Sequence, residues 1–210
     1  MKKVDIARFF ERLSQTASEP ETELNFVNDF TLLVAVVLSA QATDKGVNKA
    51  TESLFKRADT AAKMVTLGEA EIRNEVKTIG LYRNKAKNVF ALSQILHEQY
   101  DGIVPRDRET LMSLPGVGRK TANVVMNVAF GEATFAVDTH VYRLGNRTGL
   151  AKGKTVLEVE KKLDRRVPEP YRVHAHHWLI LHGRYMCKAR KPDCGNCIIS
   201  DLCGFKDKVL

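Results

Sequence analysis

Cysteine is absent from the first 186 residues of this 210-residue chain. All four cysteines, Cys187, Cys194, Cys197 and Cys203, lie within the last 24 residues. Disulfide bonds that staple a small secreted fold are spread along the chain, so this distribution argues against such a framework. Thiols clustered at one end instead favour metal ligation.

Long hydrophobic runs are also missing. The longest, residues 32–38, is far shorter than the roughly 20 residues that span a bilayer, and it predicts a buried helix. Near the N-terminus, Asp5, Arg8 and Glu11 interrupt any apolar segment, so no secretory signal is expected. We therefore expect a cytoplasmic protein with no membrane partner.

Acidic residues are outnumbered. The chain has 33 Lys and Arg residues against 25 Asp and Glu residues, which gives a formal net charge of +8. A basic balance favours a polyanionic partner, and nucleic acid is favoured over a membrane. Charge alone leaves open a basic protein that binds no particular anion.

Alternating β-type patterns are lacking as well, and helical spacing of apolar residues predicts an all-α fold. Asp29 is a candidate cap for the apolar helix, and Asp138 precedes a further helix. The cysteine-containing end is too rich in Pro, Gly and Asp for regular structure. The expected helices span residues 4–13, 30–40, 48–55, 61–67, 71–78, 84–98, 108–113, 119–130, 156–167 and 174–186.

A glycine-containing turn, Leu114-Pro115-Gly116-Val117-Gly118, separates two of these helices. Glycine at such a reversal permits positive φ or close approach of the backbone. The next helix should begin near Gly118 or Arg119, and its first amide groups could bind a phosphate. The turn resembles the helix-hairpin-helix motif of DNA-repair proteins. Residues 80–86 weakly repeat residues 116–122, which suggests two similar hairpins or a chance likeness.

Lys120 falls in the first turn of that helix, where the helix dipole disfavours a cation. The dipole, burial and the nearby Arg119 would favour the neutral amine that a nucleophile requires. A solvated or phosphate-binding lysine is the simpler alternative. Asp138, in Val137-Asp138-Thr139-His140, could cap its helix and also stabilise positive charge developing on a sugar.

The spacing of the four cysteines predicts a metal site without identifying the metal. Four thiolates suit either a tetrahedral zinc ion or a four-iron cluster. His174, His176, His177 and His182 lie nearby, but four cysteines complete either site. We therefore interpret these histidines as surface or packing residues.

Several segments together resemble the endonuclease III family of DNA glycosylases. They are residues 38–44, 79–82, 114–122, 137–140 and the cysteine pattern, and the resemblance runs almost end to end. It implies two helical domains flanking a DNA-binding cleft. Residues 22–132 would form a six-helix barrel, and residues 1–21 with 133–210 would form an iron–sulfur domain.

The resemblance also implies an activity: excision of oxidised pyrimidines, followed by strand cleavage 3′ to the abasic site through a lysine Schiff base. Lys120 would attack the sugar and Asp138 would assist. Gln41 would fill the space of the extruded nucleotide, and Leu81 would wedge the base stack. The hairpin contacts to DNA would come from Gly116, Val117, Gly118, Arg119 and Thr121.

For the cysteines, the resemblance implies a [4Fe–4S] cluster ligated by all four. The cluster would be structural, because base removal transfers no net electrons. Lys191, with Lys188 and Arg190, would form a basic loop facing the phosphate backbone. The expected partner is double-stranded DNA with oxidised pyrimidines or abasic sites, bound by a monomer in the bacterial cytosol, at the nucleoid.

Two other functions fit parts of the sequence. A monofunctional mismatch glycosylase shares the fold but usually lacks the lysine at position 120 and carries an added C-terminal domain. A noncatalytic iron–sulfur DNA-binding protein would use the hairpin and the basic loop alone. Lys120 and the end of the sequence at Leu210 argue against the first of these, and Asp138 paired with Lys120 argues against the second.

Overall fold

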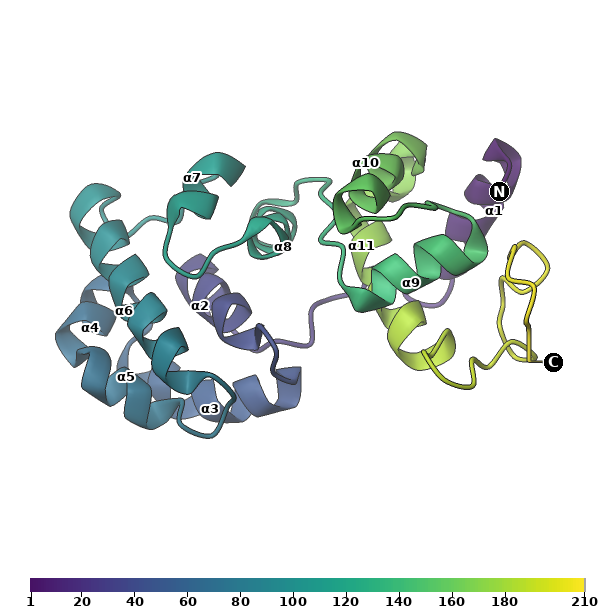
Figure 1. Cartoon of the computed structure of the whole chain (residues 1–210). Coiled ribbons are helices and arrows are strands. Elements are labelled where there is room, and N and C mark those ends of the chain that lie inside the picture. Colours follow the sequence, from purple (N-terminus) through teal and green to yellow (C-terminus); the bar gives the residue numbers. More distant parts are fainter. Residues whose placement is uncertain (210) are drawn as a thin grey trace. The chain divides into compact units, whose positions relative to one another are not determined.

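Helices make up all the regular secondary structure in the part of the chain that the structure, a computed structural model, describes (residues 1–209; Figure 1). The all-α prediction is confirmed. The elements are α1 (Lys3–Ser14), α2 (Asp29–Ser39), α3 (Asp44–Arg57), α4 (Ala61–Leu67), α5 (Glu69–Glu75), α6 (Tyr82–Gln99), α7 (Arg108–Ser113), α8 (Arg119–Phe130), α9 (Thr139–Thr148), α10 (Val156–Arg166), η1 (Glu169–Tyr171), α11 (Arg172–Leu181) and η2 (His182–Met186).

Side-chain caps explain where the sequence-based boundaries differ. The cap of α2 is Asn28, whose side chain accepts a hydrogen bond from the amide of Thr31, so the prediction for Asp29 is wrong. Helix α3 begins four residues earlier than expected because the Thr43 hydroxyl accepts a hydrogen bond from the amide of Gly46. Polar caps of this kind do not show in a hydrophobic pattern.

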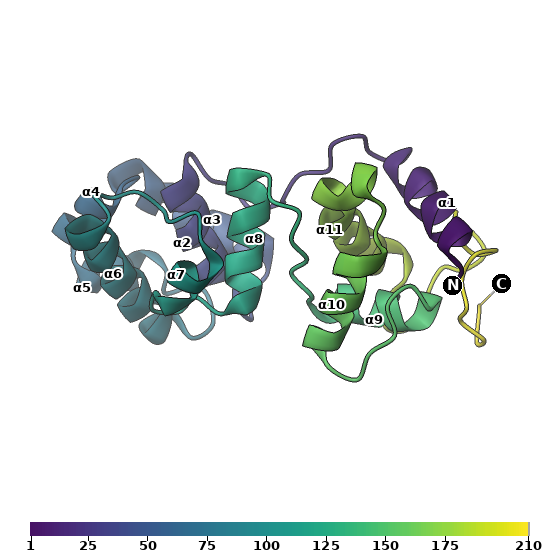
Figure 2. The same cartoon turned by 90° about the horizontal axis from the view of Figure 1, so that it is seen from above.

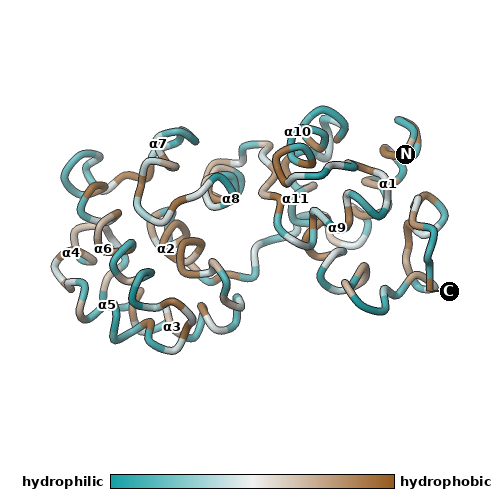
Figure 3. Tube along the Cα trace, viewed as in Figure 1, coloured by the Kyte–Doolittle hydropathy of each residue, from teal (hydrophilic) through white to brown (hydrophobic). Residues whose placement is uncertain are grey.

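The chain divides into two units, each with its own hydrophobic core. One comprises Thr22–Gly131, and the other comprises Met1–Glu21 together with the chain from Glu132 onward. The first core is built on α2, in which every residue from Phe30 to Leu38 is buried. Figure 3 shows α2 as a strongly hydrophobic segment. No helix of the described residues is both long and apolar enough to cross a bilayer.

In the Thr22–Gly131 unit, α8 packs on α2, and α4 and α5 pack on α6 (Figure 2). The short helices α5 and α7 each lead through a turn into a longer helix, α6 and α8. These are the two segments that the sequence repeat compares. Ala86 and Ala122, which end the repeated stretches, are both fully buried.

In the other unit, the N-terminal helix is bound to the C-terminal segments. Phe9 and Phe10 of α1 are fully buried in the second core. Arg12 forms a salt bridge with Asp201, and the indole N–H of Trp178 donates to the carbonyl of Ala17 at 2.8 Å. The cysteine-containing end is thereby held by residues almost 190 positions away.

Candidate active site and iron–sulfur site

The hairpin between α7 and α8 is a packed turn. Gly116 has φ +79°, and a Cβ atom added there would lie 2.9 Å from Nδ2 of Asn88 on α6. Both the backbone conformation and the available space therefore require glycine. The amide of Val117 donates to the carbonyl of Leu114 at 3.1 Å, which closes the turn, and the side chain of Val117 is buried in the core of its unit, which anchors the turn there.

The N-terminus of α8 is suited to bind an anion. Its cap residue, Gly118, provides no side-chain hydrogen bond, and the first turn contains no acidic residue. Helix α3 differs, because Thr43 caps it and Asp44 lies in its first turn. An N-terminus without a cap or a carboxylate leaves the positive end of the helix dipole for a phosphate.

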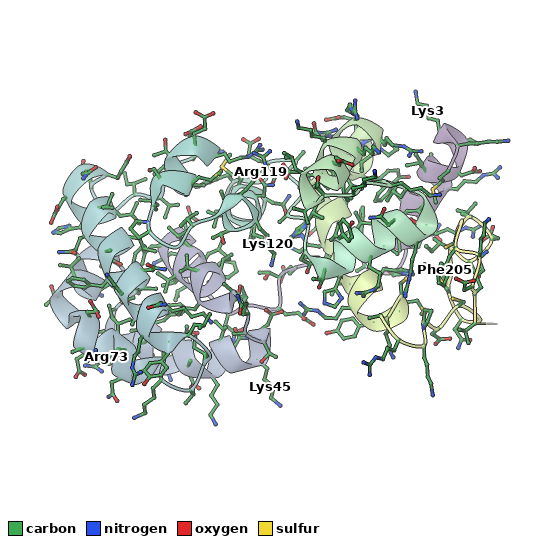
Figure 4. All side chains as sticks on the ribbon, viewed as in Figure 1. Lys3, Lys45, Arg73, Arg119, Lys120 and Phe205 are labelled. Atoms are coloured by element: carbon green, nitrogen blue, oxygen red, sulfur yellow. The ribbon has the colours of Figure 1, made fainter. Side chains whose placement is uncertain are left out.

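Lys120 is the second residue of α8, as predicted, and Figure 4 labels it with Arg119 at the start of this helix. The side chain is exposed, so the expectation that burial would favour the neutral amine is wrong.

Asp138, in the other unit, caps α9. Its Oδ1 atom accepts hydrogen bonds from the amides of His140 and Val141, at 2.8 and 2.9 Å. Both bonds use the same oxygen, so Oδ2 lies outside the cap. The capping role is therefore established, and the half-buried side chain keeps one oxygen for a second role.

Gln41 and Leu81 both have left-handed backbones, with φ +55° and +59°. Leu81 is 56% exposed, which excludes the core role that a leucine usually has. Gln41 is exposed and is not the cap of either neighbouring helix, since Ala40 is the C-cap of α2 and Thr43 is the N-cap of α3. An exposed leucine in this conformation is strained by about 1 to 2 kcal/mol, and such strain concentrates at functional sites.

The two turns lie next to each other. A Cβ atom added to Gly80 would be 3.8 Å from the carbonyl oxygen of Gln41. Residues separated by 40 positions in the sequence thus form one exposed edge of the Thr22–Gly131 unit. Lys191, in the other unit, is also exposed and left-handed, with φ +49°. Three of the four non-glycine residues with positive φ among residues 1–209 are therefore predicted DNA contacts.

All four cysteines line one pocket. Leu144, Met186, Ile199 and Phe205 contribute apolar walls. Burial raises the pKa of the Cys197 thiol, and the three other cysteines raise it further, which places the four sulfur atoms within electrostatic reach of one another. Four thiols around an apolar cavity fit a four-iron cluster, whose binding replaces their protons.

The loop between Cys187 and Cys194 is held by two arginines that the sequence reasoning missed. Arg147 donates to the carbonyls of Lys188 and Ala189 at 2.7 and 2.9 Å, and Arg143 donates to the carbonyl of Cys187 at 2.9 Å. Their spacing of four residues on α9 indicates a shared helix face, but the carbonyls that they reach could not be predicted from it. These bonds fix the backbone of the loop that carries the exposed Lys188, Arg190 and Lys191.

The histidines of α11 and η2 are packing residues, as interpreted from the sequence. His176 and His182 are buried, His174 packs on Trp178, and His182 Nε2 lies 3.4 Å from the sulfur of Cys197. Burial, and secondarily the charge of His174, lowers the pKa of His177 to about 4.

The low pKa of His177 predicts that acid destabilises this unit. Between pH 6.5 and about 4 the unfolded chain binds a proton that the folded protein does not, so the free energy of unfolding should fall as pH falls, by at most about 1.4 kcal/mol per pH unit. Urea unfolding of the wild type and of His177→Gln at pH 7.5 and 5 measures this. From pH 7.5 to pH 5 the wild type should lose more stability than the variant. Equal losses would contradict the low pKa of His177.

Iron content tests the cysteine site. We expect about four irons per chain, and Cys194→Ser should lower iron content and the yield of folded protein together, because the end of the chain has little apolar content of its own. Ser200→Ala, which alters the same cavity without removing a ligand, should keep the iron. One zinc and no iron in the wild type would refute this site.

Comparisons with known proteins agree with this description. Residues 34–169 match the HhH-GPD superfamily of base excision DNA repair proteins, and residues 187–203 match the iron–sulfur binding domain of endonuclease III. The chain is 56% identical to endonuclease III of Escherichia coli strain K12, over 100% of this chain and 99% of that protein, and 54% identical to the Haemophilus influenzae enzyme over the same shares.

A solved structure of a trapped covalent intermediate of endonuclease III with DNA has a TM-score of 0.90 to this chain, at 45% identity, covering 97% of this chain and 96% of that one. The fold and the hairpin thus define a base excision DNA repair protein. The chain belongs, within the HhH-GPD superfamily, to the endonuclease III family.

Membership establishes the activity and the cofactor. The protein is a DNA glycosylase and AP lyase of base excision repair, and its partner is DNA. Its four cysteines hold a [4Fe–4S] cluster, so the zinc alternative is set aside.

Proposed function

We propose that Lys120 is the nucleophile and that Asp138 assists it. The Lys120 amine attacks C1′ of the extruded nucleotide, the bond from C1′ to the base breaks, and the base leaves with a proton. The C1′–O4′ bond of the sugar then opens, and O4′ takes the second proton of the amine, which leaves an imine between Lys120 and C1′. The imine acidifies the C2′–H bond, and loss of a C2′ proton breaks the C3′–O bond, so that the 3′ phosphate leaves and the strand is cut on the 3′ side. The observation that carries this proposal is a lone lysine exposed at the uncapped N-terminus of α8.

The remaining roles follow the geometry of the site. Gly116, Val117, Gly118, Arg119 and Thr121 bind a phosphate through the hairpin and the start of α8. Gln41 and Leu81 enter the duplex from their shared edge, where two strained, exposed residues meet. Lys191 and its basic neighbours contact the backbone from the other unit.

The substrate class in this proposal is an oxidised pyrimidine or abasic site in double-stranded DNA. The enzyme acts as a monomer, in the cytoplasm at the nucleoid. Residues 22–132 serve as the barrel domain, and residues 1–21 with 133–210 serve as the cluster domain. The helix dipole of α8, the basic loop and the net charge of +8 all support a DNA partner.

Leu81→Ala tests the wedge. Because a smaller side chain cannot hold the base stack open, release of an oxidised pyrimidine from duplex DNA should slow by about tenfold, while cleavage at an existing abasic site should slow less. Single-turnover rates on the two substrates give the comparison. Ile103→Ala removes another exposed hydrophobic side chain, 69% exposed, from the same unit and should change neither rate. Equal losses of rate on both substrates would exclude a role for Leu81 as a wedge in the base stack.

Borohydride reduction of the wild type mixed with abasic duplex DNA tests the proposed function itself. A covalent protein–DNA product is expected, because the imine is reduced to a stable amine. Strand cleavage without any trapped product would contradict the lysine chemistry, because the strand would then be cut without an imine.

A further inference from the structure

Lys85, on α6, is a buried cation that the proposed chemistry does not use. Its residue is only 5% exposed, and no acceptor among residues 1–209 lies within hydrogen-bonding distance of its ammonium group. Burial lowers the pKa of this ammonium, as expected when a charge is withdrawn from water. A methionine of similar length would fill the same space without this cost.

Through its place on α6, Lys85 is connected to three turns of the proposed DNA-binding surface, those at Leu81, Gly116 and Gln41. Its amide donates to the carbonyl of Leu81, one helical turn earlier, at 3.1 Å. One turn later on the same side of α6, Asn88 packs against Gly116 of the hairpin. Long side chains on a helix lean toward its N-terminus, and for Lys85 this is the end of α6 that follows Leu81. The Gln41 turn lies at the same end, because its carbonyl oxygen would be 3.8 Å from a Cβ atom added to Gly80.

The Lys85 ammonium group is a hydrogen-bond donor without an acceptor, and the neighbouring turns have strained backbones. Together these features indicate a second arrangement of the turns, in which they supply the missing acceptor. The Gln41 and Leu81 turns are the segments that must enter the duplex, and each exposes backbone in a left-handed conformation. A shift of either turn changes which carbonyl oxygens face α6. The burial of an uncompensated charge in the free protein would then be offset in the DNA complex.

We propose that Lys85 is a positioning residue for nucleotide extrusion: its ammonium gains carbonyl acceptors from the Gln41 and Leu81 turns when these turns enter DNA, and it thereby holds them in their inserted arrangement. This inference rests on the proposed function. It adds to that function the residue that stabilises the inserted state from inside the protein, without touching the reacting sugar.

Lys85→Met tests the proposal. The denaturant midpoint should rise, because an unpaired charge is removed. Affinity for duplex DNA with an oxidised pyrimidine should fall about tenfold or more, the scale of one hydrogen bond from a charged group. Borohydride trapping on a single-stranded abasic oligonucleotide, in which no stack must open, should stay near wild type. Lys87→Met, which removes the same charge from the exposed side of α6, should lose much less duplex affinity.

If Lys85→Met has a lower denaturant midpoint and loses duplex affinity and single-stranded trapping to the same extent, Lys85 has only a structural role. Unchanged affinity for duplex DNA would also overturn the proposal. Wild-type protein provides a second measurement. With ¹³C-labelled lysine, the pH titration of the Lys85 Cε signal should move upward when duplex DNA is added, and an unmoved titration counts against the inference. Failure of wild-type trapping would instead refute the proposed function, so the two are distinguishable.

Discussion

Lys120→Gln should abolish strand cleavage and borohydride trapping while leaving binding to abasic DNA close to that of the wild type. The rate should fall by on the order of 10³-fold or more, because glutamine cannot form the imine and no alternative amine is placed at that point of α8. Binding should persist because the hairpin turn, the Gly118 cap position and the helix dipole remain in place. Trapped product and equilibrium affinity are measured on the same abasic duplex.

The chain provides a matched control for this variant. Lys45 is the second residue of α3, as Lys120 is of α8, and both side chains are exposed. Lys45→Gln should keep full trapping, because α3 is already capped by Thr43 and has Asp44 in its first turn. Trapping that survives in Lys120→Gln, or disappears equally in both variants, would show that the nucleophile lies elsewhere.

Much of the fold could be predicted from apolar spacing, because a helix that buries one face repeats its apolar residues along the chain. The hairpin helix was predicted to begin near Gly118 or Arg119, and it begins at Arg119. The cap of α2 could not be predicted in this way, since Asn28 and Asp29 are both good caps and only backbone geometry selects between them.

The residues of the site likewise fall into those that could be predicted from local sequence and those that could not. Clustered thiols and the glycine turn are visible locally, so both could be read from the sequence. Gln41 and Leu81 were assigned only through family resemblance, because their signal is a backbone torsion that no side-chain pattern encodes. Arg143 and Arg147 were missed since their partners are carbonyl groups about 40 residues away. The burial expected for Lys120 was wrong, because spacing along one helix does not determine what covers its first turn.

Asp138→Asn should separate the two roles of this residue. Asparagine caps helices as well as aspartate does, and its carbonyl oxygen can accept the bonds that Oδ1 now accepts from His140 and Val141. Folding and DNA binding should therefore be preserved. Turnover should slow by about 10²-fold or more, because the negative charge that stabilises the developing positive charge on the sugar is lost.

Two further variants isolate the cap from the charge. Asp138→Ala removes both, so it should add a stability loss of about 1 kcal/mol to the rate loss. Thr155→Ala removes the cap of α10 in the same unit, where the Thr155 hydroxyl accepts from the amide of Glu158, and should cost similar stability with no loss of rate. Denaturant midpoints and single-turnover rates are compared across the three. If Asp138→Asn turns over at the wild-type rate, Asp138 is a cap alone and another group must assist Lys120; if it is as unstable as Asp138→Ala, the rate loss reflects a disturbed α9 rather than a missing charge.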